Sequence, residues 1–308
     1  MLRSPLSIDE IVPLPSTKVG LGVLGRPIAH SISPILHHAA LANLSLNEPN
    51  FSNWKYERID VDPKDLSHAL TELQMSGYIG LNLTIPHKVE ILRILETVND
   101  EAKLMGAVNT LHYEHEKWVG YNTDGYGLSR GISNDLSFDV NESNVLLLGA
   151  GGAARAAAVQ CLLDGCNRLF VVNRSLERLK NLVTPLIQKF GSHRVTGSDI
   201  KNFSLSEFEN KKWLVVNATS IGLKEDDPSA LPFSCSLLGK GSAVYDMIYN
   251  PLKTTLLKDA DHAGLLSANG LSMLVFQAAK ALEVWTQQKV SAEIMMKAAK
   301  DYFLKSNE

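Results

Sequence analysis

A glycine-rich turn in the middle of the chain has the spacing of a dinucleotide-binding loop. The apolar run 145–148 leads directly into Gly149, Ala150, Gly151, Gly152 and Ala153, and an alanine-rich stretch follows. In this G-x-G-x-x-A pattern the first glycine permits a tight turn and the second lets a pyrophosphate approach the backbone. The helix N-terminus adds free N–H groups and a positive dipole end. The position between strand and helix favours a dinucleotide site over the alternative, a purely structural turn.

The residues after the next predicted strand, 169–172, indicate which dinucleotide the loop would bind. An NAD site normally has Asp or Glu here, about 20 residues past the glycines, to accept from the ribose hydroxyls. This sequence has Asn173, then Arg174 and, one helical turn on, Arg178. Guanidinium groups suit the 2′-phosphate of NADP. The alternative is two ordinary surface arginines, and the position favours NADP.

Two serines follow the first predicted strand, 19–24. In extended backbone Ser31 and Ser33 point the same way and would offer two hydroxyls to one ligand. The alternative is that Ser33, just before Pro34, caps a helix. From this segment alone, capping is favoured.

The segment 81–88 carries further polar residues. Alternation puts Leu81, Leu83 and Ile85 on one face of a strand, and Asn82 and Thr84 on the other. Lys88 lies just past the carboxyl end of this strand, where open α/β sheets bind ligands. Asn109 and Asp124 sit beside other short apolar or β-branched runs, although Asp124 is also suited to cap a helix. Each residue has a structural alternative, but their convergence favours a site.

These residues need a scaffold of alternating strands and helices. Strand-like runs are predicted at 19–24, 56–61, 78–85, 145–148, 169–172, 213–216 and 243–247, with helical stretches between them. This alternation predicts two α/β domains built on parallel sheets. The tail 271–303 is predicted to be helical and to return to the first domain. Gln277 lies off its apolar stripe, and either lines a cleft or is solvated.

Composition sets the class of protein. The chain has 308 residues and a formal net charge of −3, which argues against nucleic acid as its main partner. No apolar run approaches the ~20 residues of a membrane span, so no membrane association is expected. Three cysteines without Cys-x-x-Cys spacing predict free thiols and a cytoplasmic protein. The segment before Val19, with three prolines and no apolar core, is predicted to be a loose arm.

Together, these motifs resemble those of the shikimate dehydrogenase family, over nearly the whole chain. The matching segments are HSISP, NLTIPHK, AVNTL, YNTDG, GAGGAAR, NRS, NATSIGL, DMIYNP and NGLSMLVFQAA. The resemblance implies an α/β substrate domain formed by residues 1–125 and 269–308. It also implies a Rossmann-like NADP-binding domain, 126–268. The implied reaction is the NADP-dependent, reversible reduction of 3-dehydroshikimate to shikimate in chorismate and aromatic amino acid biosynthesis.

The resemblance also implies a role for individual residues. Lys88 and Asp124 match the catalytic pair. The residues that match substrate contacts are Ser31, Ser33, Asn82, Thr84, Asn109, Asp124, Tyr249 and Gln277. The residues that match cofactor contacts are Gly149, Ala150, Gly151, Gly152, Ala153, Asn173, Arg174, Arg178, Ala218, Thr219, Ser220, Met247 and Gly270. The chemistry agrees, because hydride addition to a ketone needs a positioned acid beside the carbonyl oxygen.

Two other functions remain open. The first is a quinate or dual quinate/shikimate dehydrogenase; Ser31 and Ser33 favour shikimate over quinate, and Asn173 with Arg174 favours NADP. The second is a catalytically silent dinucleotide-binding regulator, against which Lys88 and Asp124 argue. The implied hydride transfer requires no metal. His112 and His115 lack a third ligand and are interpreted as surface residues. The expected assembly is a monomer or homodimer.

Overall fold

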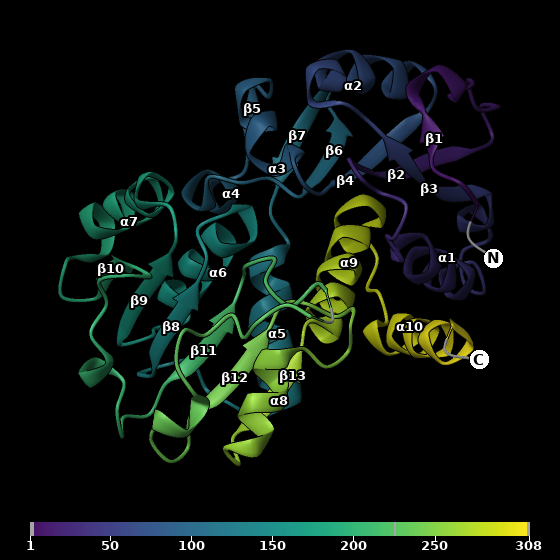
Figure 1. The fold of residues 1–308 in the computed structure, drawn as a ribbon. Helices are drawn as coiled ribbons and strands as arrows, with labels where there is room; N and C mark the ends of the chain where they lie inside the picture. The colour runs from purple at the N-terminus through teal and green to yellow at the C-terminus, as the bar shows by residue number, and fades with distance from the viewer. Residues whose placement is uncertain (1–2, 225, 307–308) are drawn as a thin grey trace. The chain divides into compact units, whose positions relative to one another are not determined.

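The protein is described here from a computed structural model, which covers residues 3–224 and 226–306. The chain forms two compact units (Figure 1). The first contains the chain up to Thr123 and again from Val275, and the second contains Asp124 to Leu274. Within the described residues, no helix is both long and apolar enough to cross a membrane.

The first unit is built on a mixed sheet of seven strands, in the order β1-β3-β2-β4-β6-β7-β5. Its strands are β1 (Leu6–Ser7), β2 (Val19–Gly25), β3 (Trp54–Asp60), β4 (Tyr78–Leu83), β5 (Thr97–Val98), β6 (Thr110–Glu114) and β7 (Lys117–Tyr121). Strands β1 to β4 are parallel, as the alternation predicts, but β6 runs antiparallel to β4 and β7. The expectation of an all-parallel sheet is therefore wrong for this unit. The β6–β7 hairpin turns at His115 and Glu116, both of positive φ.

Helices cover both faces of this sheet. They are α1 (Ser33–Leu44), α2 (Leu66–Met75), α3 (His87–Glu90), α4 (Asp100–Met105), most of α9 (Leu271–Thr286) and α10 (Ala292–Ser306). Leu70 and Leu73 of α2 join a core cluster with Leu81 and Leu83 of β4. On the other face, a Cβ at Gly80 of β4 would lie 2.6 Å from the Trp285 ring of α9. Strand β4 ends at Leu83, so Ile85 is exposed rather than part of the core face.

The C-terminal helices return to the first unit, as predicted. The indole Nε1 of Trp285 donates to the backbone oxygen of Leu111 at 2.9 Å, and α10 packs against α1. The tail is helical, as predicted, and consists of two helices, because Gln287 adopts a left-handed φ of 55° directly after α9.

The segment before Val19 is not a loose arm. Strand β1 pairs in parallel with β3, where Leu6 lies opposite Ile59. Ile8, Ile11 and Leu14 pack against the core cluster that contains α2. The segment is therefore part of the folded unit. The prediction of a loose arm, which was based on its three prolines and the absence of an apolar core, is wrong.

The second unit contains an all-parallel sheet of six strands, in the order β10-β9-β8-β11-β12-β13. Its strands are β8 (Asn144–Leu148), β9 (Arg168–Asn173), β10 (Val195–Asp199), β11 (Leu214–Asn217), β12 (Ala243–Asp246) and β13 (Leu266–Asn269). Its helices are α5 (Asp124–Leu136), α6 (Gly152–Leu163), α7 (Leu176–Phe190), α8 (Thr255–His262) and the start of α9. The strand order reverses between β8 and β11, and open α/β sheets bind ligands beyond the carboxyl ends of strands at such a point.

Candidate functional site

In the first unit, two predicted site residues, Asn109 and Gln277, form a buried hydrogen-bond network with Thr123. The amide Nδ2 of Asn109 donates to Thr123 Oγ1 at 3.0 Å and to Gln277 Oε1 at 3.3 Å. The Thr123 backbone N–H donates to Asn109 Oδ1 at 2.8 Å. All three residues are buried, so Gln277 is not the solvated glutamine that the helical spacing allowed. The structure brings Asn109 and Gln277 together from positions 168 residues apart.

Asn82 belongs to the adjoining part of this network. Its Nδ2 donates to the backbone oxygen of Asn109 at 3.2 Å and to Thr110 Oγ1 at 3.1 Å. Its Oδ1 accepts from the Tyr56 hydroxyl at 2.7 Å. Both amide hydrogens therefore have protein acceptors, which leaves Asn82 Oδ1 able to accept a further hydrogen bond.

Sequence reasoning missed Tyr56, Thr110 and Thr123 as members of this network. Tyr56 lies on β3 and stacks on His37 of α1, with ring centroids 4.0 Å apart. Burial lowers the pKa of His37 to about 3. The position of Thr110 in the network follows from strand pairing, since it is the register partner of Asn82, and this register is not evident from the sequence alone.

Ser31 and Ser33 lie close together after β2. The Ser31 hydroxyl donates to Ser33 Oγ at 3.1 Å, and the Ser33 backbone N–H donates to Ser31 Oγ at 3.3 Å. Helix α1 begins at Ser33 with Ile32 as its N-cap, and no side chain in the described chain caps it. The capping role that the segment favoured on its own is therefore wrong, and both hydroxyls face each other as a pair.

Thr84 and Lys88 follow β4, and both are half-buried. Gly25 makes room for Thr84, since a Cβ there would lie 2.3 Å from Thr84 Cγ2. Lys88 lies in the short helix α3, and its backbone oxygen accepts from Val108 N–H at 2.8 Å. Asp124, the other predicted catalytic residue, is buried and is the first residue of α5 in the second unit.

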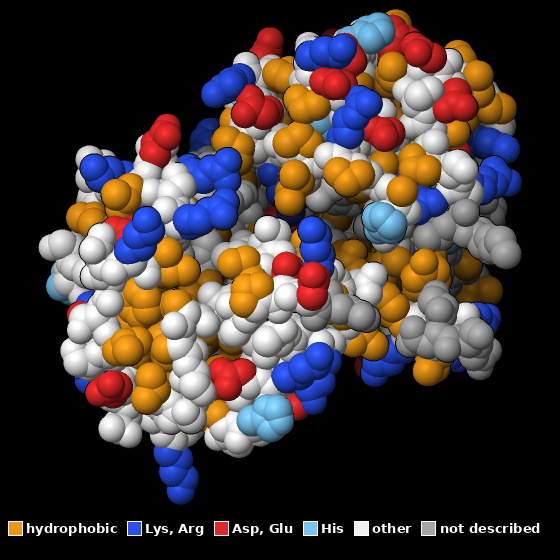
Figure 2. Space-filling model, viewed as in Figure 1, with side chains coloured by type: hydrophobic (Ala, Val, Ile, Leu, Met, Phe, Trp, Pro, Cys, Tyr) orange, Lys and Arg blue, Asp and Glu red, His pale blue; other side chains and the backbone are white. Residues whose placement is uncertain are grey.

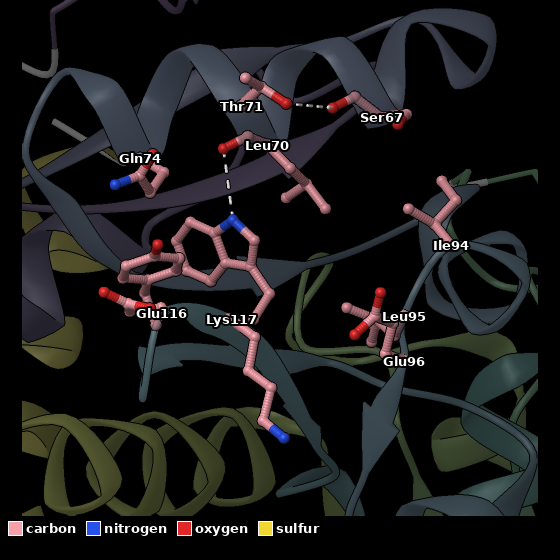
Figure 3. A pocket seen from close by; sticks show the side chains of 11 residues that line it. Ser67, Leu70, Thr71, Gln74, Ile94, Leu95, Glu96, Glu116 and Lys117 are labelled. Atoms are coloured by element: carbon pink, nitrogen blue, oxygen red, sulfur yellow. Dashed lines mark hydrogen bonds between the residues drawn. The ribbon is translucent and has the colours of Figure 1, made fainter.

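The first unit also has a surface hollow of about 300 Å³, which is separate from these residues (Figure 3). It lies between α2, the segment before β5 and the β6–β7 hairpin. Trp118 is one of its lining residues and donates from its indole nitrogen to the Leu70 backbone oxygen at 3.3 Å. None of the predicted site residues is among its lining residues, so the hollow is not the predicted site.

In the second unit, the glycine loop has the geometry that a pyrophosphate requires. Gly149 has a φ of +110°, and a Cβ there would lie 2.9 Å from the backbone oxygen of Ala218. A Cβ at Gly151 would meet no atom within 4 Å, so the backbone is open to a ligand at this position. Helix α6 begins at Gly152, and no side chain caps it within the described residues. The loop therefore fits a phosphate group that accepts from backbone N–H groups.

The loop after β9 presents the predicted 2′-phosphate residues. Asn173 Nδ2 donates to the Ser175 backbone oxygen at 2.9 Å, and Ser175 Oγ accepts from Arg178 N–H at 3.3 Å. Arg174 and Arg178 are exposed, and neither forms an ion pair among residues 3–224 and 226–306. Figure 2 shows Lys and Arg side chains gathered around α7 on the face in view. The two guanidinium groups are thus available to an anion.

The remaining predicted cofactor residues lie in the loops after β11, β12 and β13. Thr219 is held by Asn217, whose Oδ1 accepts from its N–H at 3.0 Å and its hydroxyl at 2.8 Å. Position 270 has room only for a glycine, since a Cβ there would lie 2.1 Å from the Met247 backbone oxygen. Asn217 and Asp246, which the sequence reasoning did not assign, end β11 and β12 and are bonded to each other at 2.9 Å. Burial raises the pKa of Asp246 above its ordinary value.

No group of three His, Cys, Asp or Glu side chains suited to a metal ion occurs in the part of the chain that is described. The three cysteines are free and buried.

Three segments of the chain match sequence models of known protein domains. Residues 23–111 match the shikimate dehydrogenase substrate binding domain, residues 132–208 match shikimate/quinate 5-dehydrogenase, and residues 270–300 match the shikimate 5′-dehydrogenase C-terminal domain.

Whole proteins match as well. The NADP(+) shikimate dehydrogenase of Methanococcus aeolicus is 36% identical over 281 residues, which cover 91% of this chain and 96% of that protein. A crystal structure of a shikimate dehydrogenase in complex with NADP+ superposes with a TM-score of 0.83 at 33% identity, covering 94% of this chain and 97% of that one. The Thermus thermophilus enzyme, in complex with NADP(H) and shikimate, gives 0.77 at 33% identity, covering 92% and 99%. With this identity over nearly its whole length, the chain belongs to the shikimate dehydrogenase family.

Proposed function

We propose that this protein is an NADP-dependent oxidoreductase that reversibly reduces 3-dehydroshikimate to shikimate, a step of chorismate and aromatic amino acid biosynthesis. The main support for the proposal is that this chain, a member of the shikimate dehydrogenase family, contains two features together. The first is a buried network of neutral polar side chains around Asn109 and Gln277, and the second is an open glycine loop at Gly151. Relatives named NADP(+) shikimate dehydrogenases, and a solved relative holding NADP(H) and shikimate, support both halves.

Most of the proposed contacts to the ring acid come from the first unit. Neutral amides and hydroxyls both donate and accept hydrogen bonds, which suits a ring with several hydroxyl groups. We assign the carboxylate to Ser31 and Ser33. We assign the ring hydroxyls to Asn82, Thr84, Asn109, Asp124 and Gln277, with Tyr249 as a further substrate contact. Asn82 would act as an acceptor through Oδ1, since its amide hydrogens are already donated within the protein.

The second unit would bind the dinucleotide. The loop Gly149, Ala150, Gly151, Gly152 and Ala153 would hold the pyrophosphate, because its backbone is open and the α6 N-terminus faces it. Asn173, Arg174 and Arg178 would hold the 2′-phosphate, while Ala218, Thr219, Ser220, Met247 and Gly270 would contact the rest of the cofactor. NADPH supplies a hydride when bound. We propose residues 1–125 with 269–308 as the substrate domain and 126–268 as the cofactor domain.

The protein's own chemical contribution would be a proton. As the ketone carbon gains a hydride, its oxygen becomes strongly basic and needs an acid within hydrogen-bond reach. Lys88 Nζ is the proposed donor, and the Asp124 carboxylate would orient the ammonium group. In the reverse direction, the Lys88 amine would accept the proton of the substrate hydroxyl. A cytoplasmic location is also proposed, and three free buried thiols support it.

An absorbance assay at the NADPH band tests the function. Shikimate or quinate is supplied with NADP+ or NAD+, which gives four combinations. Turnover of shikimate with NADP+ well above the other three is the expected result. Comparable turnover of quinate would instead support the dual enzyme, while absence of turnover with all four, in a folded protein that binds NADP+, would support the silent regulator.

A further inference from the structure

A fully buried carboxylate lies at the carboxyl end of β12, outside every role assigned above. Asp246 has no exposed surface. Its Oδ1 accepts from Asn217 Nδ2 at 2.9 Å and from the Ile248 backbone N–H at 3.1 Å, and its Oδ2 accepts from the Thr254 hydroxyl at 2.6 Å. Three donors from three segments therefore converge on one side chain.

Asn217 extends this arrangement into the loop after β11. Its Nδ2 also donates to the Ile221 backbone oxygen at 3.3 Å, and its Oδ1 accepts from both Thr219 donors. The Ile221 N–H in turn donates to Thr219 Oγ1 at 3.1 Å. The turn that carries residues 218–220 is thus organised around the side chain that Asp246 holds.

The loop after β12 is fixed by the same pair of residues. The Met247 N–H donates to the Asn217 backbone oxygen at 2.9 Å, and the Ile248 N–H donates to the Asp246 carboxylate. Gly270 then packs against the Met247 backbone, and its N–H donates to the Ile248 oxygen at 3.0 Å. Asn217 and Asp246 therefore join the loops that carry Thr219, Met247 and Gly270.

The stability of the fold alone does not explain why a carboxylate is buried at position 246. Burying a charge without a cationic partner is costly, and apolar groups of similar size often stabilise a core equally well. Asp246 has no ion pair with a Lys or Arg among the described residues, and its charge is balanced only by neutral donors. Such a group at the ligand-binding edge of a parallel sheet is better explained by the geometry that it imposes.

We propose that Asp246 is a positioning residue for the dinucleotide, which acts through Asn217 and the backbone of residues 247–248. This rests on the function proposed above. Removing its charge loosens the three loops together and weakens cofactor binding, while the Asn109 network of the first unit keeps its affinity for shikimate.

The test compares Asp246→Asn with Ser242→Ala, a control directly before the first residue of the same strand. Ser242 is also buried, accepts from Trp213 N–H at 3.0 Å and donates to the Gly239 oxygen at 2.7 Å, but none of the proposed cofactor residues bonds to it. A second pair, Thr254→Val and Thr254→Ser, removes or keeps the hydroxyl that reaches Asp246 Oδ2. NADP+ dissociation constants are measured by calorimetric titration without shikimate, and each variant is unfolded with urea.

We expect Asp246→Asn to weaken NADP+ binding about 10-fold or more, the effect of losing hydrogen bonds to a charged group. Thr254→Val should weaken it less and Thr254→Ser should restore it, whereas Ser242→Ala should reduce stability with little change in affinity. If Asp246→Asn fails to fold, the Thr254 pair decides. Wild-type NADP+ affinity in folded Asp246→Asn, or equal weakening in Ser242→Ala, would overturn the proposal. A wild-type protein that binds no NADP+ would overturn the proposed function instead.

Discussion

The substrate-side and cofactor-side regions are built from different parts of the chain. In the first unit, side chains do the bonding, as in the network of Asn82, Asn109 and Gln277. In the second unit, backbone dominates, and the critical positions are glycines such as Gly149, Gly151 and Gly270, which are defined by what a Cβ would meet. The first arrangement can distinguish one small molecule from another through its pattern of donors and acceptors. The second is suited to phosphate groups, which need close approach to backbone N–H groups.

This contrast predicts two kinds of sensitivity. Side-chain sites should fail when a functional group is removed, whereas backbone sites should fail when atoms are added. The two regions can be tested separately, since Lys88 and the Asn109 network lie in the first unit, whereas the glycine loop and the two arginines lie in the second.

The largest effect is expected from removing one functional group in the first unit. Lys88→Ala should lower kcat by about 10²–10⁴-fold, the usual contribution of a positioned general acid. The KM for shikimate should change much less, because the proposed carboxylate and hydroxyl contacts remain. Steady-state kinetics at saturating NADP+ measures both, with Lys103→Ala, which changes an exposed side chain of α4, as the control. Turnover like that of the wild type in folded Lys88→Ala would rule out this role.

In the second unit, the charged side chains proposed to contact the cofactor directly are at the 2′-phosphate end. Removing one charge-assisted contact at Arg174 should weaken NADP binding by about 10–150-fold and leave NAD use nearly unchanged. If Arg178 shares the contact, Arg174→Ala alone should weaken NADP binding less. The double variant, Arg174→Ala with Arg178→Ala, should then show the full loss of NADP affinity. The kcat/KM ratio of the two cofactors measures this. An unchanged ratio in the double variant would remove the arginines from the site.

The side-chain region also carries an acid-sensitive group. His37 is fully buried on Tyr56, and its pKa of about 3 lies below the ordinary value of 6.5. Between these values the unfolded chain binds a proton that the folded chain excludes, so stability is present above pH 6.5 and is lost as pH falls. From pH 7 to pH 5 this loss amounts to about 2 kcal/mol.

Urea unfolding at pH 5, 6 and 7 tests the role of His37. His37→Phe keeps a ring on Tyr56 and should remove this part of the pH dependence, whereas His68→Gln on the exposed face of α2 should not. Parallel pH profiles for wild type and His37→Phe would contradict the prediction.

The smallest effect is expected from adding one methyl group to the backbone site. Gly151 has an extended backbone with free space around it, so Gly151→Ala should fold with unchanged or slightly raised stability. It should nevertheless weaken NADP+ binding about tenfold, because the methyl occupies the pyrophosphate approach. Gly149→Ala is the contrasting variant, since its φ and the nearby Ala218 oxygen predict a loss of stability. If Gly151→Ala binds NADP+ normally, the loop does not hold the pyrophosphate.

Much of the fold could be predicted, because the strand–helix alternation and the apolar runs are strong local signals. The missing parts depend on contacts distant in sequence. Strand β1 exists because the β3 edge pairs with it, and β13 (Leu266–Asn269) is too polar to be recognised without its neighbour β12. The antiparallel direction of β6 also follows from pairing rather than from composition.

For the site, the motifs located individual residues but not their partners. The motifs contain Thr110, Asn217 and Asp246 but do not indicate which side chains these residues bond to. Tyr56 lies outside the motifs. Two of the key bonds join residues opposite each other in register, Asn82 with Thr110 and Asn217 with Asp246. Register is a property of the assembled sheet, so the sequence alone could not supply these pairs.

Helix α9 has a consequence for the order in which the protein folds during synthesis. Because the first unit is interrupted, its last segment, from Val275 onwards, leaves the ribosome after every residue of the second unit. Until then, Gly80 of β4 lacks the Trp285 ring, and α1 lacks α10. The second unit is continuous from Asp124 to Leu274 and can form its sheet first, whereas the first unit waits with an apolar face uncovered. The nascent chain is therefore most prone to aggregate, and most in need of a chaperone, at its N-terminal end.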